Sequence, residues 1–271
     1  MKKITLIVLL LCLPVFAWSN PLGYTVTTFE NQSQQVESHL MLIDLSTGAY
    51  TDLGLVGFNS AQGLAFANNQ LYAVGEPGSG SGSGEFWNLT TPPGYMIGGT
   101  GAGLSIDGLD YDRATGTMYQ LSTYAMLTQL YSINMTTGEA TVVVGSVMAT
   151  MIDGLAINSQ GNIFAAGSWS NSLYQINLID GTFAPVGNLD IEGTGSFGLA
   201  FDESDILWAL RSDGSIFTVD TSTGAATFVA QTIANNGGLA INLVATPEPA
   251  TMLMLGLGLL GVLGIRRKMQ K

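Results

Sequence analysis

The sequence contains very few of the side chains on which most catalytic and metal sites depend. Its 271 residues include one cysteine, Cys12, and one histidine, His39. Because Cys12 lies in an N-terminal segment that is expected to be removed, the mature chain would hold no disulfide, thiolate nucleophile or cysteine-based metal site. A single histidine leaves zinc sites and Ser-His-Asp triads without enough members. We interpret His39, which begins a short apolar run, as a strand residue rather than as a catalytic base.

Basic side chains are also scarce between the two ends of the chain. Eight Lys and Arg residues face 20 Asp and Glu residues, which gives a formal net charge of −12. Six of the eight lie in the first three or last six positions, so the body holds only Arg113 and Arg211 against 19 acidic residues, a formal charge of −17. Such a surface repels nucleic acid phosphates, and its expected partners are cations, basic polymers or neutral glycans. The plain alternative is that the charge only keeps the protein soluble.

The first 19 residues have the layout of a secretory signal peptide. Lys2 and Lys3 precede an apolar run from Ile4 to Ala17, and a small-residue boundary lies at Ala17 or Ser19. This is the order of basic, apolar and small residues that signal peptidase recognises. An uncleaved anchor is the alternative, but an apolar run of about 14 residues is short for a membrane span. We therefore predict residues 1–19 as a signal peptide and residues 20–245 as an exported domain.

The last 26 residues, 246–271, combine three features in a fixed order. Pro247-Glu248-Pro249 comes first, an uncharged run rich in Leu, Gly and Met covers about 250–265, and Arg266-Arg267-Lys268 follows directly. Sixteen helical residues reach only about 24 Å against a hydrocarbon core of about 30 Å, so the span is marginal unless the arginines snorkel. Because basic residues prefer the cytoplasmic side, we predict a transmembrane helix that leaves the acidic domain outside the inner membrane.

This C-terminus resembles the PEP-CTERM sorting signal of exported Gram-negative proteins, many of them from producers of exopolysaccharide and biofilm. The resemblance covers only about the last 25 residues of the chain. It implies recognition at Pro247, Glu248 and Pro249 by an exosortase, a membrane protease-transpeptidase that removes the tail. The precursor would face the periplasm from the inner membrane and then move to the cell surface or matrix. The alternative is that Pro-Glu-Pro is a stiff linker before an ordinary anchor.

A short phrase that begins with Gly-Leu recurs five times along the body. Successive copies start 45, 46, 44 and 40 residues apart. The copies are Gly63-Leu64-Ala65-Phe66, Gly108-Leu109-Asp110-Tyr111, Gly154-Leu155-Ala156-Ile157, Gly198-Leu199-Ala200-Phe201 and Gly238-Leu239-Ala240-Ile241. A second marker, Asp or Asn with a following Gly, occurs later in each unit, as in Asp44 to Gly48 and Asp220 to Gly224. The Asp or Asn bonds the backbone ahead of it and the glycine allows positive φ, so the marker predicts a hairpin turn.

Four short apolar runs fill each unit of about 40 to 46 residues, which is the size and pattern of a β-propeller blade. The complete units are 63–107, 108–153, 154–197 and 198–237. The fragment 238–243 supplies one further strand, and the N-terminal segment supplies three, at 24–29, 39–44 and 49–54. We therefore predict an all-β fold, a five-bladed β-propeller closed by pairing the C-terminal strand with the N-terminal strands. Six blades and an open solenoid, whose broken ends would stay unpaired, are the alternatives.

The most suggestive group of carboxylates is Asp107, Asp110 and Asp112. Alternation along a strand would place Asp110 and Asp112 on one face. Calcium favours several carboxylate and carbonyl ligands, so these three residues are the candidates for a metal site. The alternative for Asp112 is that it caps the turn that follows it. Asp153 precedes a repeat glycine as Asp107 does, and the two are candidates for one channel mouth.

These observations predict a non-catalytic binding or structural propeller with no resident cofactor. Its expected ligands are matrix polysaccharide or another surface protein, and its processing partners are signal peptidase and an exosortase. The alternative is a carbohydrate-active or lactone-cleaving propeller enzyme that uses carboxylates, with or without calcium. Glycoside cleavage needs two carboxyl groups set across the sugar. Three or more acidic side chains at one channel mouth would favour the enzyme, and a channel lined by Ala, Leu and Met would favour binding.

Overall fold

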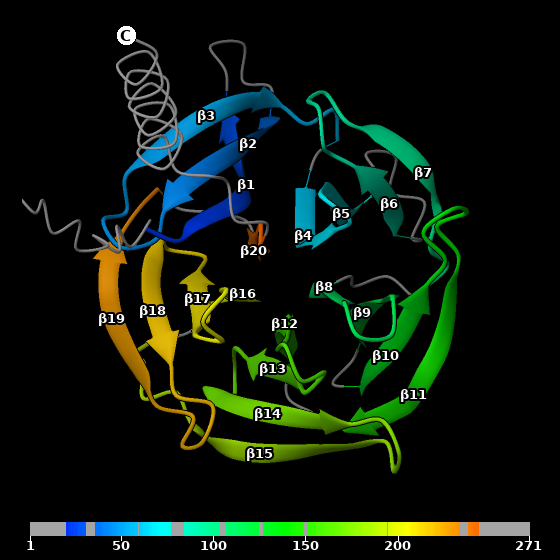
Figure 1. Cartoon of the computed structure of the whole chain (residues 1–271), viewed down its shortest axis with the longest axis vertical. Helices are drawn as coiled ribbons and strands as arrows, with labels where there is room; N and C mark the ends of the chain where they lie inside the picture. The colour runs from blue at the N-terminus through cyan, green and yellow to red at the C-terminus, as the bar shows by residue number, and fades with distance from the viewer. Residues whose placement is uncertain are drawn as a thin grey trace, which may run out of the picture. The chain divides into compact units, whose positions relative to one another are not determined.

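Five antiparallel sheets of four strands each surround a common centre in the part of the chain that the structure describes (Figure 1). The computed structural model describes residues 20–30, 36–58, 60–76, 84–102, 107–124, 127–148, 151–193, 195–233 and 238–243. Apart from Asn20, they belong to one unit that extends from Pro21 to Thr246. This architecture confirms the predicted five-bladed β-propeller.

Each sheet forms one blade, which we number in chain order from the first complete unit. Blade 1 contains β4 (Ser60–Ala67), β5 (Gln70–Glu76), β6 (Glu85–Asn88) and β7 (Tyr95–Gly99). Blade 2 contains β8 (Leu109–Asp112), β9 (Thr117–Tyr124), β10 (Leu127–Ile133) and β11 (Ala140–Met148). Blade 3 contains β12 (Ile152–Ile157), β13 (Ile163–Gly167), β14 (Ser172–Asn177) and β15 (Thr182–Asn188). Blade 4 contains β16 (Phe197–Phe201), β17 (Leu207–Arg211), β18 (Ser215–Val219) and β19 (Ala226–Gln231).

Blade 5 joins the two ends of the domain. Its strand order is β20 (Ala240–Ile241), β1 (Leu22–Glu30), β2 (Val36–Asp44) and β3 (Tyr50–Leu55). In the antiparallel pairing of β20 with β1, Gly23 lies opposite Ile241 and Tyr24 opposite Ala240. The buried hydroxyl of Thr25 also donates to the carbonyl oxygen of Gly238 over 2.8 Å. The C-terminal strand therefore closes the ring as predicted.

The repeat glycines allow neighbouring innermost strands to approach closely. A Cβ atom on Gly63 of blade 1 would lie 2.6 Å from the nitrogen of Leu109 in blade 2. A Cβ atom on Gly198 of blade 4 would lie 2.5 Å from the nitrogen of Leu239, at the start of blade 5. The remaining contacts run from Gly108 to Leu155, from Gly154 to Leu199 and from Gly238 to Leu64. Each glycine thus contacts the repeat leucine of the next blade, and the fifth contact returns to blade 1.

The repeat leucines contribute to five hydrophobic clusters, one between each pair of adjacent blades. Leu109, for example, packs with Val74 and Phe86 of blade 1, and Leu155 packs with Leu121 of blade 2. All five repeat leucines are buried, with 1 to 2% of their surface exposed. The core of this protein is therefore a ring of interfaces between blades rather than one central mass.

The second marker forms turns as its side chains predict. The Asp44 carboxylate accepts hydrogen bonds from the nitrogens of Ser46 and Thr47 over 2.9 and 3.1 Å. Asp220 accepts from the nitrogens of Ser222 and Thr223 over 2.7 and 3.2 Å. The glycines of these turns have positive φ, +76° at Gly48 and +83° at Gly224. These bonds confirm that the second marker forms hairpin turns.

The expected targeting segments, 1–19 and 246–271, lie outside the described residues. The predicted transmembrane helix at about 250–265 belongs to the second of them. Among the described residues, no helix is long and apolar enough to cross a membrane.

Candidate functional site

A cavity of about 320 Å³ opens at the ends of the five innermost strands. The fourth residue of every repeat phrase lines it, so all five blades contribute to its wall. The rest of the lining consists of the third residue of three phrases, both residues of the hairpin turn after β4, Arg113 of the turn after β8 and two residues after β20. The lining residues are Phe66, Asn68, Asn69, Asp110, Tyr111, Arg113, Ile157, Ala200, Phe201, Ala240, Ile241, Asn242 and Leu243.

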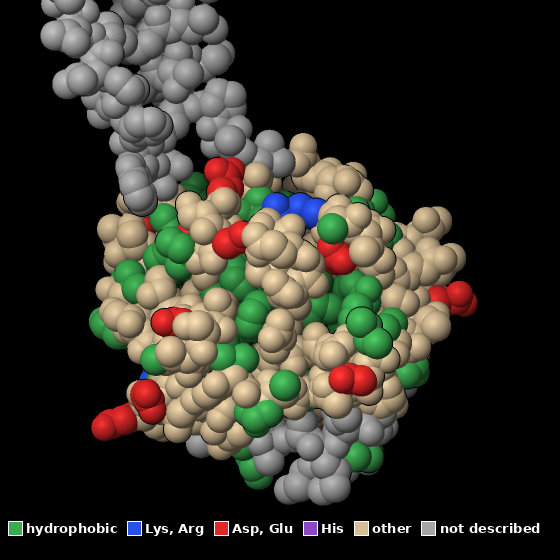
Figure 2. Space-filling model, turned by 60° about the horizontal axis from the view of Figure 1, so that its bottom comes forward, with side chains coloured by type: hydrophobic (Ala, Val, Ile, Leu, Met, Phe, Trp, Pro, Cys, Tyr) green, Lys and Arg blue, Asp and Glu red, His purple; other side chains and the backbone are tan. Residues whose placement is uncertain are grey.

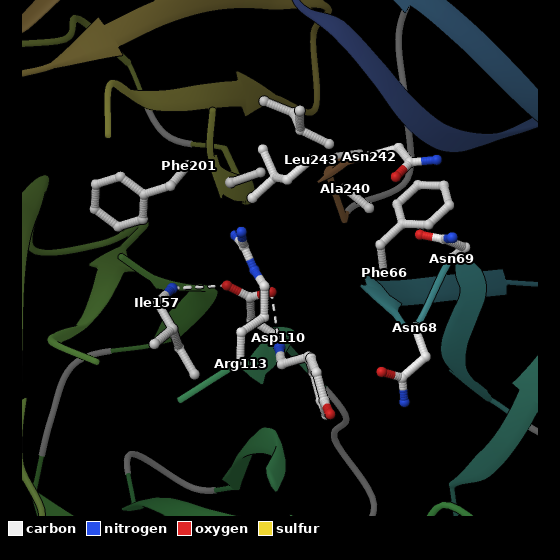
Figure 3. A pocket seen from close by; sticks show the side chains of 13 residues that line it. Phe66, Asn68, Asn69, Asp110, Arg113, Ile157, Phe201, Ala240, Asn242 and Leu243 are labelled. Atoms are coloured by element: carbon white, nitrogen blue, oxygen red, sulfur yellow. Dashed lines mark hydrogen bonds between the residues drawn. The ribbon is translucent and has the colours of Figure 1, made fainter. Parts of the chain in front are cut away.

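Asp110 is the carboxylate at the floor of this cavity. It occupies the third position of the repeat phrase, where the other four blades carry alanine. Its Oδ2 accepts a hydrogen bond of 2.6 Å from the nitrogen of Ile157 in blade 3, and its Oδ1 accepts one of 2.8 Å from the nitrogen of Tyr111. These two bonds fix the orientation of the carboxyl group across the boundary between blades 2 and 3 (Figure 3).

The surroundings of Asp110 disfavour its charged form. Burial raises the pKa of this carboxyl to about 7, although the two backbone hydrogen bonds and the Arg113 guanidinium lower it. Asp112 raises it further by charge repulsion. The side chain is half-buried, and it lines the cavity. Asp110 therefore exchanges its proton close to neutral pH and is able to act as hydrogen-bond donor or acceptor.

Arg113 extends over Asp110 toward the middle of the cavity (Figure 3). Its side chain is exposed, and it makes no hydrogen bond and no ion pair with the described residues. The other basic residue of the body, Arg211, pairs with Asp213 and donates to the carbonyl oxygen of Glu192 over 2.6 Å. On the face drawn in Figure 2, acidic side chains are scattered widely and basic ones occupy very little of the surface. Arg113 is therefore a cation that the described part of the fold leaves available to a ligand.

Amide side chains stand across the cavity from Arg113 (Figure 3). Asn68 and Asn69 form the turn between β4 and β5 with positive φ, 50° and 64°. Two successive residues with positive φ make the tight hairpin turn in which Asn is favoured. Both side chains are exposed and make no hydrogen bond within the described residues. Asn242 follows β20 and completes this polar side of the wall.

Aromatic rings provide the apolar part of the wall. Phe66 packs edge-on against Tyr24, with ring centroids 5.0 Å apart, and Phe201 packs against Phe164 at 5.7 Å. These contacts hold the rings in place from behind. The cavity thus combines fixed apolar walls with a few polar groups, which is the usual composition of a small-molecule site, and its volume lies at the lower end of the usual range.

Asp112 takes part in a turn rather than in the cavity wall. Its side chain is buried, and it accepts hydrogen bonds from the nitrogen of Ala114 over 2.9 Å and from the hydroxyl of Thr115 over 2.7 Å. The corresponding residue of blade 4, Asp202, behaves similarly, because it accepts from the nitrogen of Ser204 in its own turn over 2.8 Å. Asp205 in the same turn accepts from the nitrogen of Ser159 in blade 3 over 2.9 Å. These carboxylates stabilise the loops around the cavity.

Asp107 and Asp153 lie at the opposite ends of the innermost strands from the cavity. Asp107 is buried, and burial raises the pKa of Asp153 to about 6 while hydrogen bonds from Ser168 lower it. Asp153 borders the space enclosed by the repeat glycines and leucines, where the described residues leave no volume that water could enter. The axis of the propeller is therefore filled, and the three candidate metal ligands are divided between its two ends.

No group of three or more His, Cys, Asp or Glu side chains that could hold a metal occurs in the described ranges. The histidine lies in the sheet of blade 5 and is not among the residues that line the cavity. His39 lies in β2, where its Nδ1 stands 2.9 Å from Oδ2 of Asp52 on the neighbouring strand and its ring contacts Phe29. The interpretation of His39 as a strand residue is confirmed.

The sequence pattern pointed to Asp110 but not to the other polar residues of the cavity. No motif marks Arg113, Asn68 and Asn69, which lie in turns, or Asn242, which follows β20. Two signals were present in the sequence. Asp110 replaces an alanine found in the other four copies of the phrase, and Arg113 is one of only two basic residues in the body.

Comparisons with solved structures agree with the fold. A chain in the crystal structure of a nidogen/laminin complex superposes with a TM-score of 0.51 and 12% identity, over 83% of this chain and 86% of that chain. A protein from Lactobacillus plantarum superposes with a TM-score of 0.47 and 16% identity, over 77% of this chain and 65% of its own length. At this identity the first similarity concerns the fold alone. No curated protein sequence matches this one.

The C-terminal segment matches a family model. Residues 245–268 match the model of the PEP-CTERM protein-sorting motif, and this range contains Pro247-Glu248-Pro249 and Arg266-Arg267-Lys268. The motif implies processing by an exosortase and an exported precursor that passes the membrane. The chain therefore combines a five-bladed β-propeller with a C-terminal PEP-CTERM sorting motif.

Proposed function

We propose that this protein is a surface or extracellular-matrix protein whose propeller binds a ligand without converting it. After signal peptidase acts, the precursor is held in the inner membrane with the propeller in the periplasm. An exosortase then removes the tail and the domain moves to the surface or matrix. There it contributes to exopolysaccharide or biofilm by binding polysaccharide or another surface protein. The match of residues 245–268 to the sorting motif is the observation that carries this proposal.

The cavity supports the binding half of the proposal. It has apolar walls, and the amides of Asn68 and Asn69 and the guanidinium of Arg113 make no hydrogen bond within the described residues. Asp110 is the one acidic residue among those that line it. Glycoside cleavage uses two carboxyl groups about 5 to 9.5 Å apart on either side of the scissile bond. The neighbouring carboxylate of Asp112 is occupied by its own turn.

A fractionation experiment tests the sorting half. In the producing bacterium, mass spectrometry of the mature C-terminus should find the chain cut near Pro247 in the surface or matrix fraction. Glu248→Ala, or loss of the exosortase, should leave the full-length precursor in the inner membrane. Glu203→Ala is the matched control, since Glu203 is exposed in a propeller turn. A wild-type tail that stays intact in the inner membrane refutes the sorting claim.

An enzyme that uses Asp110 as a general acid is the second candidate. The observation that favours it is the pKa of this carboxyl, about 7, because catalytic acids often titrate near the working pH. Glycan and lactone panels, each with and without a chelator, distinguish the two functions. Binding without turnover supports the binding propeller. Hydrolysis that Asp110→Asn abolishes supports the enzyme, and additional sensitivity to chelator indicates calcium.

A further inference from the structure

We propose that the cavity binds a small carboxylate rich in hydroxyl groups, of the sugar-acid class, with Arg113 paired to the ligand carboxylate. This inference rests on the binding function proposed above and names the ligand class of the same site. Four features of the cavity carry it: the arginine, the carboxyl group beneath it, the amides opposite and the aromatic wall.

Arg113 selects for an anionic group. A planar guanidinium offers paired N–H donors that match the two oxygens of a carboxylate. In a body with 19 acidic residues and two arginines, the exposed guanidinium of Arg113 meets no carboxylate within the described residues at ion-pair distance. The charge of Arg113 acts on the carboxyls of Asp110 and Asp205, but neither lies at ion-pair distance. Its guanidinium donors, directed into the cavity, are therefore free to pair with the carboxylate of a ligand.

Asp110 limits the charge of that ligand. Its carboxyl group lies at the base of Arg113, and two backbone N–H groups fix its orientation. The described lining holds one cation and one acid, so a dianionic phosphate would be poorly compensated. A monoanionic carboxylate pairs with Arg113, and the protonated form of Asp110 donates a hydrogen bond to the ligand instead of repelling it.

The opposite wall is suited to hydroxyl groups. The amides of Asn68 and Asn69 each provide two donors and an acceptor, and neither has a partner in the described structure. Hydroxyl groups, which both donate and accept, satisfy amides of this kind. Phe66 and Phe201 add flat apolar surface on two sides of the cavity. A ring that carries hydroxyl groups on its edge and C–H groups on its faces fits this arrangement.

Calorimetric titration of the full chain in detergent tests the proposal. The probes are D-galacturonate and D-glucuronate, each with its neutral hexose, D-galactose or D-glucose, and acetate and inorganic phosphate as simple anions. At least one uronate should bind with a Kd at least tenfold lower than that of its hexose. Acetate and phosphate should bind at least tenfold more weakly than that uronate. Equal affinity for uronate and hexose, or stronger binding of acetate or phosphate, overturns the proposal.

Substitutions assign the effect to individual side chains. Arg113→Gln should remove the preference for the uronate, and Arg113→Lys should keep part of it because the charge remains without the paired donors. Arg211→Gln is the matched control, since it removes the same charge away from the cavity, with a melting curve to verify folding. Asn69→Ala should weaken the binding of the uronate and of the hexose by similar factors. A preference that survives Arg113→Gln, or that Arg211→Gln removes equally from a folded protein, overturns the assignment.

The outcome is separable from the proposed function. If the protein is sorted normally and binds glycans with no preference for a carboxylate, the proposed ligand class is wrong and the proposed function is still supported. A precursor that stays in the inner membrane but prefers the uronate supports the ligand class and refutes the sorting.

Discussion

The third position of the repeat phrase is alanine in four innermost strands and Asp110 in β8. The four alanines show that the fold does not require a carboxyl group at this place. Asp110 brings a cost, because burial raises the pKa of its carboxyl to about 7 and disfavours its charged form. Groups that are costly for folding are common at binding and catalytic sites, and the position of Asp110 in the cavity agrees with that pattern.

Asp110 should make the stability of the protein depend on pH. The pKa of its carboxyl is 3.8 when unperturbed and about 7 in the fold, so the folded state binds more protons between these values. The free energy of unfolding should therefore fall as pH rises from about 4 to 8, and Asp153, at about 6, adds to the fall. Asp110→Asn should reduce the loss between pH 5 and 8 by about 1 to 3 kcal/mol, allowing for partial exposure.

Chemical denaturation at a series of pH values measures this effect. Asp190→Asn, at an exposed position, is the control and should leave the slope unchanged. Below pH 4 the opposite trend should appear. Hydrogen bonds from Arg211, Thr182 and Ser222 lower the pKa values of Asp213, Asp180 and Asp220, so their contributions are lost as pH falls. A wild-type profile that is flat from pH 5 to 8 would contradict the role given to Asp110.

The repeat glycines should tolerate no side chain. A Cβ atom at Gly108 would lie 2.5 Å from Cβ of Leu155 in the next blade, which forces the two innermost strands apart. Gly108→Ala should therefore lower the free energy of unfolding by about 2 kcal/mol or more. Gly145→Ala in β11 is the matched control, because nothing lies within 4 Å of its added Cβ. Similar urea midpoints for the two variants would argue against the close approach of blades.

At the scale of single residues, the sequence was enough to predict the turns, but it was not enough to predict most residues of the cavity. The turn marker depends on a side chain and a glycine a few positions apart, so its role follows from the sequence alone, as at Asp44 and Gly48. The cavity depends on which turns meet around the axis. Asn68 and Arg113 approach the same space only because the ring brings blades 1 and 2 together.

Strand β20 is the element on which closure depends. It has only two residues, Ala240 and Ile241, yet it completes blade 5 and borders the cavity. Ile241 is 8% exposed and packs in the cluster between blades 4 and 5. A short strand contributes few hydrogen bonds, so the buried side chains around it must supply much of its stability.

A charge in β20 should open the ring. Ile241→Asp would place a carboxylate in the cluster between blades 4 and 5, and we expect the melting temperature to fall by many degrees. Ile179→Asp is the matched control, because Ile179 is 97% exposed in a hairpin turn, and it should leave the melting curve almost unchanged. Deletion of residues 238–243 should have an effect at least as large as that of Ile241→Asp. A normal melting curve for this deletion would show that closure does not stabilise the domain.

The elements themselves followed from the repeat period, but their limits did not. The predicted units began at the repeat glycines, whereas β4 begins at Ser60, three residues earlier, and β8 begins at Leu109, one residue later. Strand limits depend on where the neighbouring strand stops pairing. The pairing of β4 with β5 shifts register between Ala61 and Gly63, and the sequence pattern holds no signal for that shift.

At the scale of the whole molecule, stability comes from five interfaces that repeat around the axis. Each hydrophobic cluster joins two adjacent blades, and the last joins blade 5 to blade 1. This arrangement explains why counting repeats was enough to predict the architecture. The first three strands and the last strand of the propeller are each an incomplete blade. They form a complete sheet, and so can pack against both neighbouring blades, only when they pair in blade 5.

The formal charge of the body should make the stability of the whole domain sensitive to salt. The body holds nineteen acidic residues and only two basic ones, so its carboxylates repel one another across the ring, and few ion pairs offset this repulsion in the described residues. Charges on one domain interact over about 30 Å at 10 mM salt but over less than 10 Å at 500 mM. Raising sodium chloride from 10 to 500 mM should therefore raise the melting temperature by several degrees.

Removal of exposed acidic groups separates this electrostatic effect from other actions of salt. Asp190, Glu192 and Glu203 are exposed carboxylates in connections between strands. A triple variant, Asp190→Asn with Glu192→Gln and Glu203→Gln, should melt higher than the wild type at 10 mM salt and converge with it at 500 mM. If the two proteins instead differ by the same amount at every salt concentration, the substitutions act locally, and repulsion across the propeller is not what the added salt relieves.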